Sequence, residues 1–145
     1  MLPTKILVAT DGSLGSHLAA RRAVELAQAF GSELHVVHVS PVFEPYYIAA
    51  KPFTEESTMY EEDAQWAQEL LDEQVKQLEE AGKVTKAHLR TGKPDAGVIE
   101  VGEEIGADLI VVGRRGLSAL RHPIGSVSSS IAAHAHCAVL VVRGE

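Results

Sequence analysis

The stretch "ADLIVVGRRGLSALRHPIGSVSSS", residues 107–130, decides the fold class of this 145-residue chain. It opens with a short apolar run rich in branched side chains, which is typical of a buried strand. Gly113 and Gly116 end that run, and Gly125 with Ser126 begins a segment with helical spacing of apolar residues. A strand that leads through a glycine-rich turn into a helix is the repeating unit of parallel α/β proteins.

The same alternation of strands and helices extends over the rest of the chain. Apolar runs predict strands at residues 5–10, 33–40, 83–92, 108–113 and 138–143. Periodic apolar positions predict helices at residues 18–30, 58–81, 93–106 and 124–135, and the three prolines of residues 41–57 predict a loop. In the last helix we expect an inward stripe of Ile124, Val127, Ser128, Ile131, Ala132 and Ala135.

The order β-α-β-α-β-α-β-α-β predicts one domain over residues 1–145, with a parallel sheet covered by helices on both faces. In such sheets ligands bind beyond the carboxyl ends of the strands, where the strand order reverses. Strands 5–10 and 108–113 end at "TDGS" and "GRRG". If those two strands are neighbours, both turns face one crevice.

The composition excludes several classes of function. With 46% hydrophobic and 23% charged residues, the chain reads as a soluble globular protein. Its net charge of −7 argues against nucleic acid as a partner, because that needs a basic face. A single cysteine, Cys137, allows no intrachain disulfide and fits a reducing compartment. No apolar run is long enough for a membrane span or a signal peptide, so we expect a cytoplasmic protein without membrane partners.

The glycines of residues 113–126 suggest a cradle for an anion. Gly113 and Gly116 would let main-chain N–H groups approach a ligand, and Gly125-Ser126 would offer the free N–H groups of a helix start. The alternative is that the glycines only form turns and Ser126 only caps the helix. The chain contains neither a P-loop nor a complete dinucleotide fingerprint.

Four motifs taken together resemble the universal stress protein family. They are "KILVATDGS" at residue 5, "HVVHVS" at residue 35, "TGKP" at residue 91, and the region from "ADLIVVGRRG" to "CAVLVVR". The resemblance implies a Rossmann-like, five-stranded parallel sheet of order 3-2-1-4-5 and a homodimer. For one subgroup, recognised by G-x2-G-x9-G-[ST], it implies bound ATP.

This chain departs from the subgroup pattern in one place. Only eight residues, "LSALRHPI", separate Gly116 from Gly125, so the loop that would wrap the phosphates is one residue short. The resemblance therefore implies either ATP or another adenine nucleotide (AMP, ADP or cyclic AMP), or no binding at all. It implies Mg²⁺ or Mn²⁺ only beside a triphosphate.

Carried over position by position, the resemblance predicts the residues of a nucleotide site. Ala9, Thr10 and Asp11 would meet adenine and ribose, although Asp11 could equally cap the first helix. Val39 would touch the adenine, and Gly92 would border the pocket. The phosphates would meet the turn and the helix start, at Gly113, Gly116, Gly125, Ser126 and Val127, while Arg114 and Arg115 would contribute charge alone.

These patterns lead to three hypotheses of function. The first is an adenine-nucleotide-binding sensor of the stress response, with no catalytic residue and a homodimer formed by the last strand, Ala138 to Val142. The second is a dimeric interaction protein without a ligand, and the third is a slow ATPase. We interpret "HAHC", residues 134–137, as a helix terminus and not as a metal site. The serines at 128–130 lack a nucleophile elbow, which argues against a serine hydrolase.

Overall fold

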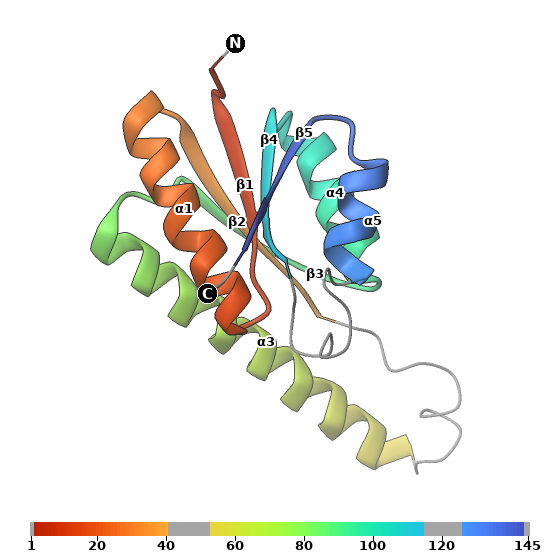
Figure 1. The fold of residues 1–145 in the computed structure, drawn as a ribbon. Helices are drawn as coiled ribbons and strands as arrows, with labels where there is room; N and C mark the ends of the chain where they lie inside the picture. The colour runs from red at the N-terminus through yellow and green to blue at the C-terminus, as the bar shows by residue number, and fades with distance from the viewer. Residues whose placement is uncertain (1, 41–52, 115–125, 144–145) are drawn as a thin grey trace.

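The computed structural model describes residues 2–40, 53–114 and 126–143, and gives the backbone alone for residues 53–64 (Figure 1). Its five strands are β1 (Lys5–Ala9), β2 (Glu33–Ser40), β3 (Lys86–Thr91), β4 (Leu109–Gly113) and β5 (Ala138–Val142). They form one parallel sheet in the order β3-β2-β1-β4-β5. The predicted α/β class and strand order are therefore confirmed.

Helices cover both faces of this sheet (Figure 1). On one face α1 (Leu14–Phe30) and α3 (Phe53–Ala81) pack against Ile6 and Val8 of β1. On the other face α4 (Pro94–Ile105) and α5 (Ser126–His134) pack against Leu7. Side chains alternate between the faces along a strand, so β1 must be apolar at successive positions to be buried on both sides.

The residues at the caps determine where the helices begin and end. Gly31 and Gly106 end α1 and α4 in left-handed conformations, with φ of 68° and 70°, which glycine adopts without steric cost. At the start of α1 the hydroxyl of Ser13 accepts a hydrogen bond from Ser16 N, 3.2 Å away. Ser13 is therefore the N-cap, a position where serine is strongly preferred.

Two sequence-based expectations about the helices were wrong. The predicted loop of residues 41–57 ends earlier, because α3 begins at Phe53; Glu55 and Glu56 then fall in its first turn, where the helix dipole favours acidic residues. In α5, Val127 and Ala132 are exposed, while Ser128 and Ile131 are the buried residues. The inward stripe is narrower than expected because α5 is short and lies over the edge of the sheet. Ile124 and residues 41–52 lie outside the described residues.

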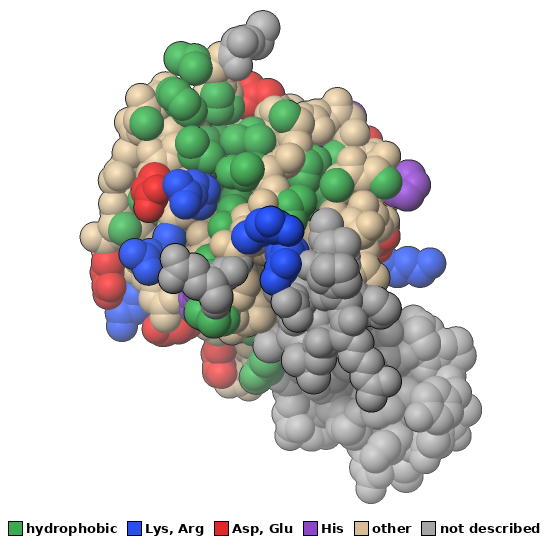
Figure 2. Space-filling view, viewed as in Figure 1, with side chains coloured by type: hydrophobic (Ala, Val, Ile, Leu, Met, Phe, Trp, Pro, Cys, Tyr) green, Lys and Arg blue, Asp and Glu red, His purple; other side chains and the backbone are tan. Residues whose placement is uncertain are grey.

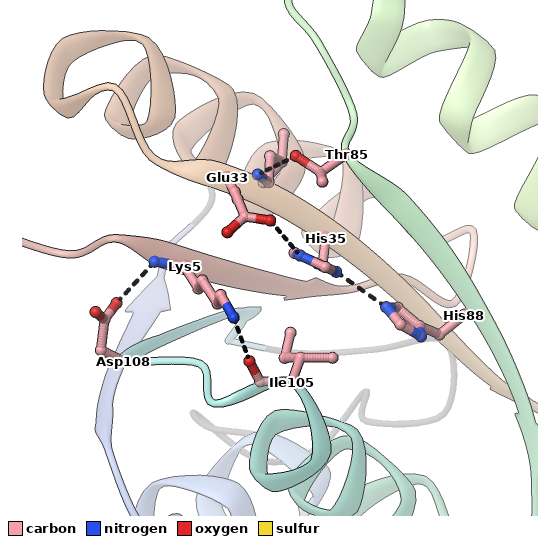
Figure 3. A network of polar contacts seen from close by, with 8 residues as sticks. Lys5, Glu33, His35, Thr85, His88, Ile105 and Asp108 are labelled. Carbon is pink, nitrogen blue, oxygen red and sulfur yellow. Dashed lines mark hydrogen bonds and ion pairs between the residues drawn. The ribbon is translucent and has the colours of Figure 1, made fainter.

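Polar contacts tie the amino ends of the strands together (Figure 3). The carboxylate of Asp108 accepts hydrogen bonds from the main-chain N–H groups of Thr4 and Lys5. The Lys5 ammonium donates to the carbonyl of Ile105, 3.0 Å away. These contacts hold the start of β1 against the turn that leads into β4, at the end of the sheet opposite to the candidate site.

Candidate functional site

The carboxyl ends of β1 and β4 lie side by side, as the register of the pair Val8 and Val111 shows. The chain leaves β1 for α1 on one face and, after β4, continues to α5 on the other face. Because the two connections diverge, a crevice is expected at this point, which is where parallel sheets bind ligands. The strands that end at "TDGS" and "GRRG" are neighbours, which is the arrangement in which both turns would face one crevice.

The first turn of α5 is joined to the end of β4. The hydroxyl of Ser128 donates a hydrogen bond to the carbonyl of Arg114, 2.8 Å away. The N–H of Arg114 in turn donates to the carbonyl of Val142 in β5, 2.9 Å away. These two bonds fix the main chain of Arg114 and place the start of α5 within one helical turn of the crevice.

Ser126 and Val127 form the start of α5, and both are exposed. The first N–H groups of a helix have no partner within the helix, and the dipole adds positive potential at the same end. A negatively charged group placed here would therefore meet donors without displacing a buried side chain. The N-cap position, Gly125, lies outside the described residues together with Arg115 and Gly116.

Gly113 packs closely against the main chain of a distant part of the same polypeptide. A Cβ atom at this position would lie 2.5 Å from the carbonyl oxygen of Gly15, well inside van der Waals contact. The glycine therefore allows the first turn of α1 to approach the end of β4. We had expected Gly113 to admit an anion, and the contact found in the structure is with Gly15 of α1.

Thr10 is buried and uses all of its polar groups within the protein. Its N–H donates to the carbonyl of Val37 at 2.9 Å, and its hydroxyl donates to Oε1 of Gln74 in α3 at 2.8 Å. Its carbonyl accepts a hydrogen bond from Nδ1 of His38, 2.8 Å away. The side chain of Thr10 thus faces α1 and α3, and the residue borders the crevice through its main chain.

Asp11 follows at the mouth of the crevice. Its Oδ1 accepts a hydrogen bond from the N–H of Ser13, 2.9 Å away, which closes a turn in front of α1. Of the two roles predicted for Asp11, capping belongs to Ser13, and Asp11 supports the turn that presents the cap. Asp11 is partly exposed, so its carboxylate lies at the surface of the site.

Ala9 and Val39 lie on the α4 and α5 face of the sheet, and Gly92 lies beyond the end of β3. The Val39 side chain is buried against α4, where a Cβ at Gly97 would lie 2.7 Å from it. Gly92 has a φ of +132°, which L side chains rarely adopt, and its N–H donates to the carbonyl of Ser40. The three residues thus lie at or near the carboxyl ends of β1, β2 and β3.

A polar contact links α4 with α5 close to the same end of the sheet. The hydroxyl of Ser130 donates a hydrogen bond to Oδ2 of Asp95, 2.7 Å away. This hydrogen bond lowers the pKa of Asp95, because it stabilises the charged form of the carboxylate. Asp95 is therefore ionised at neutral pH and forms a charged contact between two helices.

Sequence reasoning missed the role of His38. The alternation of β2 indicated only that His35 and His38 lie on opposite faces, which the contacts of the two rings confirm. His38 is 3% exposed, bonds to Thr10, and meets the ring of Trp66 in an edge-on arrangement at 6.3 Å between centroids. No pattern in the sequence connects residue 38 with residues 10 and 66.

Among the described residues, no three His, Cys, Asp or Glu side chains are grouped so that they could hold a metal ion. In the same parts of the chain, no helix has the length and apolar character needed to cross a membrane. The described part of the predicted site, nine of its twelve residues, consists of strand ends, the turns that follow them and one helix start.

Comparisons with known proteins agree with this architecture. The sequence profile described as "Universal stress protein family" matches residues 3–143. A protein of Staphylococcus aureus (strain USA300), named as a candidate universal stress protein, is 39% identical over 145 residues, which cover 97% of this chain and 84% of the relative. The chain belongs to the universal stress protein family.

Solved structures of the family have the same fold. Universal stress protein UspA from Lactobacillus plantarum superposes with a TM-score of 0.81 at 25% identity, over 97% of both chains. A universal stress protein in complex with cAMP has a TM-score of 0.69 at 26% identity, over 99% of this chain and 98% of that one. The universal stress protein from Archaeoglobus fulgidus in complex with dAMP has a TM-score of 0.70 at 25% identity, over 97% and 98%.

Proposed function

We propose that this protein is an adenine-nucleotide-binding module of the stress response, which binds its ligand in the crevice beyond β1 and β4. The observation that carries the proposal is the placement of the α5 start beside the paired ends of these strands, through the bond of Ser128 to Arg114. Two solved relatives of similar fold are complexes with cAMP and dAMP, which supports this class of ligand.

In this proposal the phosphate groups of the nucleotide bind at the start of α5. The exposed N–H groups of Ser126 and Val127 would donate to phosphate oxygens, and the helix dipole would add to the attraction. Arg114 would supply positive charge, as would Arg115, while Gly116 and Gly125 would complete the turn. A Gly-Ser pair at a helix start is suited to this role because neither residue has a bulky side chain.

The adenine and ribose would bind on the other side of the crevice, near the ends of β1, β2 and β3. Ala9 and Val39 would form an apolar border, and Gly92 would leave room at the end of β3. Thr10 would act through its main chain, because its hydroxyl is bonded to Gln74. Asp11, at the mouth of the site, has acceptor oxygens suited to ribose hydroxyls.

The eight-residue spacer between Gly116 and Gly125 leaves open how many phosphate groups the bound nucleotide carries. ATP, ADP, AMP and cyclic AMP share the adenine end and differ only where the loop is short. Mg²⁺ or Mn²⁺ would bind only beside a triphosphate, which supplies most of the oxygen ligands that such ions prefer. We place the protein in the cytoplasm and treat residues 1–145 as one domain.

We also propose a homodimer formed through β5. This strand lies at the edge of the sheet, and the side chains of Val139 to Val142 are half-buried. Figure 2 shows hydrophobic side chains gathered over the face on which β5 lies. An apolar edge with unpaired main-chain groups is a template for pairing with a second copy.

Titration calorimetry with ATP, ADP, AMP, cyclic AMP and adenosine tests the nucleotide proposal, with Ser126→Asp as the informative variant. An acidic residue at a helix start stabilises the helix, so the variant should melt no lower than the wild type. The same charge repels phosphate. We therefore expect affinity for the phosphorylated ligands to fall about 10-fold or more, while binding of adenosine is unchanged.

Ala132→Asp is the matched control, because it adds the same charge to an exposed position of α5 away from its start. It should leave every affinity unchanged. If the wild type binds none of the five ligands, the proposal fails and the protein is an interaction module without nucleotide. If Ser126→Asp weakens adenosine as much as AMP, the phosphate does not bind at the start of α5.

A further inference from the structure

The carbonyl of Thr10 lies one residue beyond the end of β1, where the strand ladder no longer supplies a donor. His38 of β2 supplies one, because its Nδ1 lies 2.8 Å from this oxygen. Both residues are buried, at 4% and 3% exposure. A buried carbonyl without a partner is destabilising, so the imidazole satisfies a group that water cannot reach.

The acceptor determines the tautomer of His38. A carbonyl oxygen can only accept, so Nδ1 must carry the proton, and Nε2 of the neutral ring is then a bare acceptor. Nε2 is buried and has no hydrogen-bond partner among the residues that the structure describes. An orphaned acceptor is unfavourable for stability, which indicates that the ring is present for the bond made by Nδ1.

The bond orients the peptide that joins Thr10 to Asp11. This peptide is trans, as are all peptide bonds of the described chain, so its C=O and N–H point in opposite directions. His38 draws the C=O toward the face of the sheet that carries α3, where the ring also meets Trp66. The N–H of Asp11, on the other side of the same peptide plane, is thereby held in the opposite direction, away from the imidazole.

The side chain of Thr10 holds the same peptide from a second direction. Its hydroxyl bonds to Gln74 of α3 and lies 3.3 Å from the hydroxyl of Ser16 in α1. Rotation of the Thr10–Asp11 peptide would have to break the bond to His38 while the side chain stays anchored. The carbonyl bond to His38 therefore favours one of the two orientations of this peptide plane.

We propose that His38 is a positioning residue of the nucleotide site, whose Nδ1–H fixes the Thr10–Asp11 peptide and so presents Asp11 to the ligand. This role rests on the proposed function. It assigns to His38 no contact with the nucleotide. The ligand-bordering residue that the His38 ring contacts is Thr10, and the effect of the ring passes through the Thr10 carbonyl.

Three variants of β2 test the proposal by calorimetry with the best-bound nucleotide of the wild type. His38→Leu removes the donor, and we expect affinity to fall about 10-fold, the effect of one lost hydrogen bond. His38→Asn retains an N–H two bonds from Cβ, as Nδ1 does, and should recover affinity to within about 3-fold of wild type. His35→Leu, a buried histidine on the opposite face, is the control and should bind as the wild type does.

A second measurement is independent of nucleotide binding and of the folding of any variant. Nitrogen-15 NMR of the wild-type histidines reports which ring nitrogen carries the proton, and we expect Nδ1–H for His38. An Nε2–H tautomer would overturn the proposal, as would wild-type affinity in His38→Leu. If the wild type binds no nucleotide, the proposed function itself fails and the positioning role fails with it, even where the Nδ1–H tautomer is found.

Discussion

Gly113 lies where the end of β4 and the first turn of α1 come into main-chain contact. The space for a Cβ atom is already occupied by Gly15, whose carbonyl oxygen and carbon lie 2.5 and 2.6 Å away. Neither atom belongs to a flexible side chain, so the contact cannot be relieved by a change of rotamer. At this residue, the absence of a side chain determines how α1 sits on the sheet.

Gly113→Ala should therefore lower the free energy of unfolding by about 3 kcal/mol, the upper part of the range for overpacking a core. Urea denaturation at neutral pH measures the change. Gly31→Ala is the control, since a Cβ there meets nothing within 4 Å and only the positive φ opposes it, at about 1 kcal/mol. A Gly113→Ala variant that is no less stable than Gly31→Ala would show that α1 shifts freely.

The residue scale is also where sequence reasoning reached its limit. The glycines of residues 113–125 were recognisable because glycine marks a close approach, yet the pattern did not say what approaches. For Gly113 the neighbour is Gly15, almost a hundred positions earlier in the chain. His38 was predicted to occupy one face of β2, but its bond to Thr10 depends on the register between two strands. Contacts of this kind are set by tertiary packing and leave no local signal.

At the scale of elements, prediction was more successful because hydrophobic periodicity is repeated over many residues. Continuous apolar runs predicted the buried strands, and Gly31 and Gly106 predicted the ends of α1 and α4. The start of α3 was missed because prolines in residues 41–52 outweighed the helix-forming residues that follow them. The exposure of Val127 was missed because a helix over a sheet edge buries fewer of its apolar positions.

The pairing of β2 with β3 includes a buried histidine pair (Figure 3). Nδ1 of His35 and Nε2 of His88 are joined by a hydrogen bond of 3.0 Å, and the two rings are stacked. The pKa of His88 is lowered to about 4, chiefly by burial and in addition by positive charge from His35, Lys86 and Arg90, against a smaller opposing effect of Glu104. The folded protein therefore keeps His88 neutral in a pH range where the unfolded chain binds a proton.

This difference makes the strand pair sensitive to acid. Because the pKa of His88 is lower in the folded state, its contribution to stability is complete above pH 6.5 and is lost as the pH falls toward 4. Between pH 7.5 and 4.5 the loss should be about 2–3 kcal/mol. Urea unfolding at both values measures it, and the decrease should be smaller by that amount in His88→Gln. His134→Gln, at an exposed position of α5, should keep the wild-type dependence.

A His88→Gln variant with the full wild-type decrease between the two pH values would assign the acid sensitivity to other groups. The titration of the Asp95 carboxylate can be distinguished from that of His88, because it occurs at a lower pH. Its pKa is lowered below 3.8 by the bond from Ser130, so it loses stabilising charge only at more acidic pH. The two titrations therefore report on two different junctions, one between β2 and β3 and the other between α4 and α5.

At the scale of the whole molecule, the two edges of the sheet differ. At the β3 edge the strand has polar and charged residues, and its Arg90 pairs with Glu104 of α4 at 2.9 Å. The β5 edge consists of Ala138, Val139, Leu140, Val141 and Val142. Charged side chains protect an edge from pairing, whereas an apolar edge favours it. The asymmetry supports the proposal that association occurs at β5, where a two-fold pair would close the edge.

Val141→Glu should convert the proposed dimer to a folded monomer. In an antiparallel pair of β5 with its own copy, the two-fold axis brings the added carboxylates of both chains to the same interface, where like charges repel. The side chain is only half-buried within one chain, so the monomer can tolerate the change. Sedimentation velocity over a range of concentrations measures the association state. Phe30→Glu places the same charge on an exposed position of α1 and should leave the dimer intact. A wild type that sediments as a monomer, or a Val141→Glu variant that remains dimeric, would show that β5 does not form the interface.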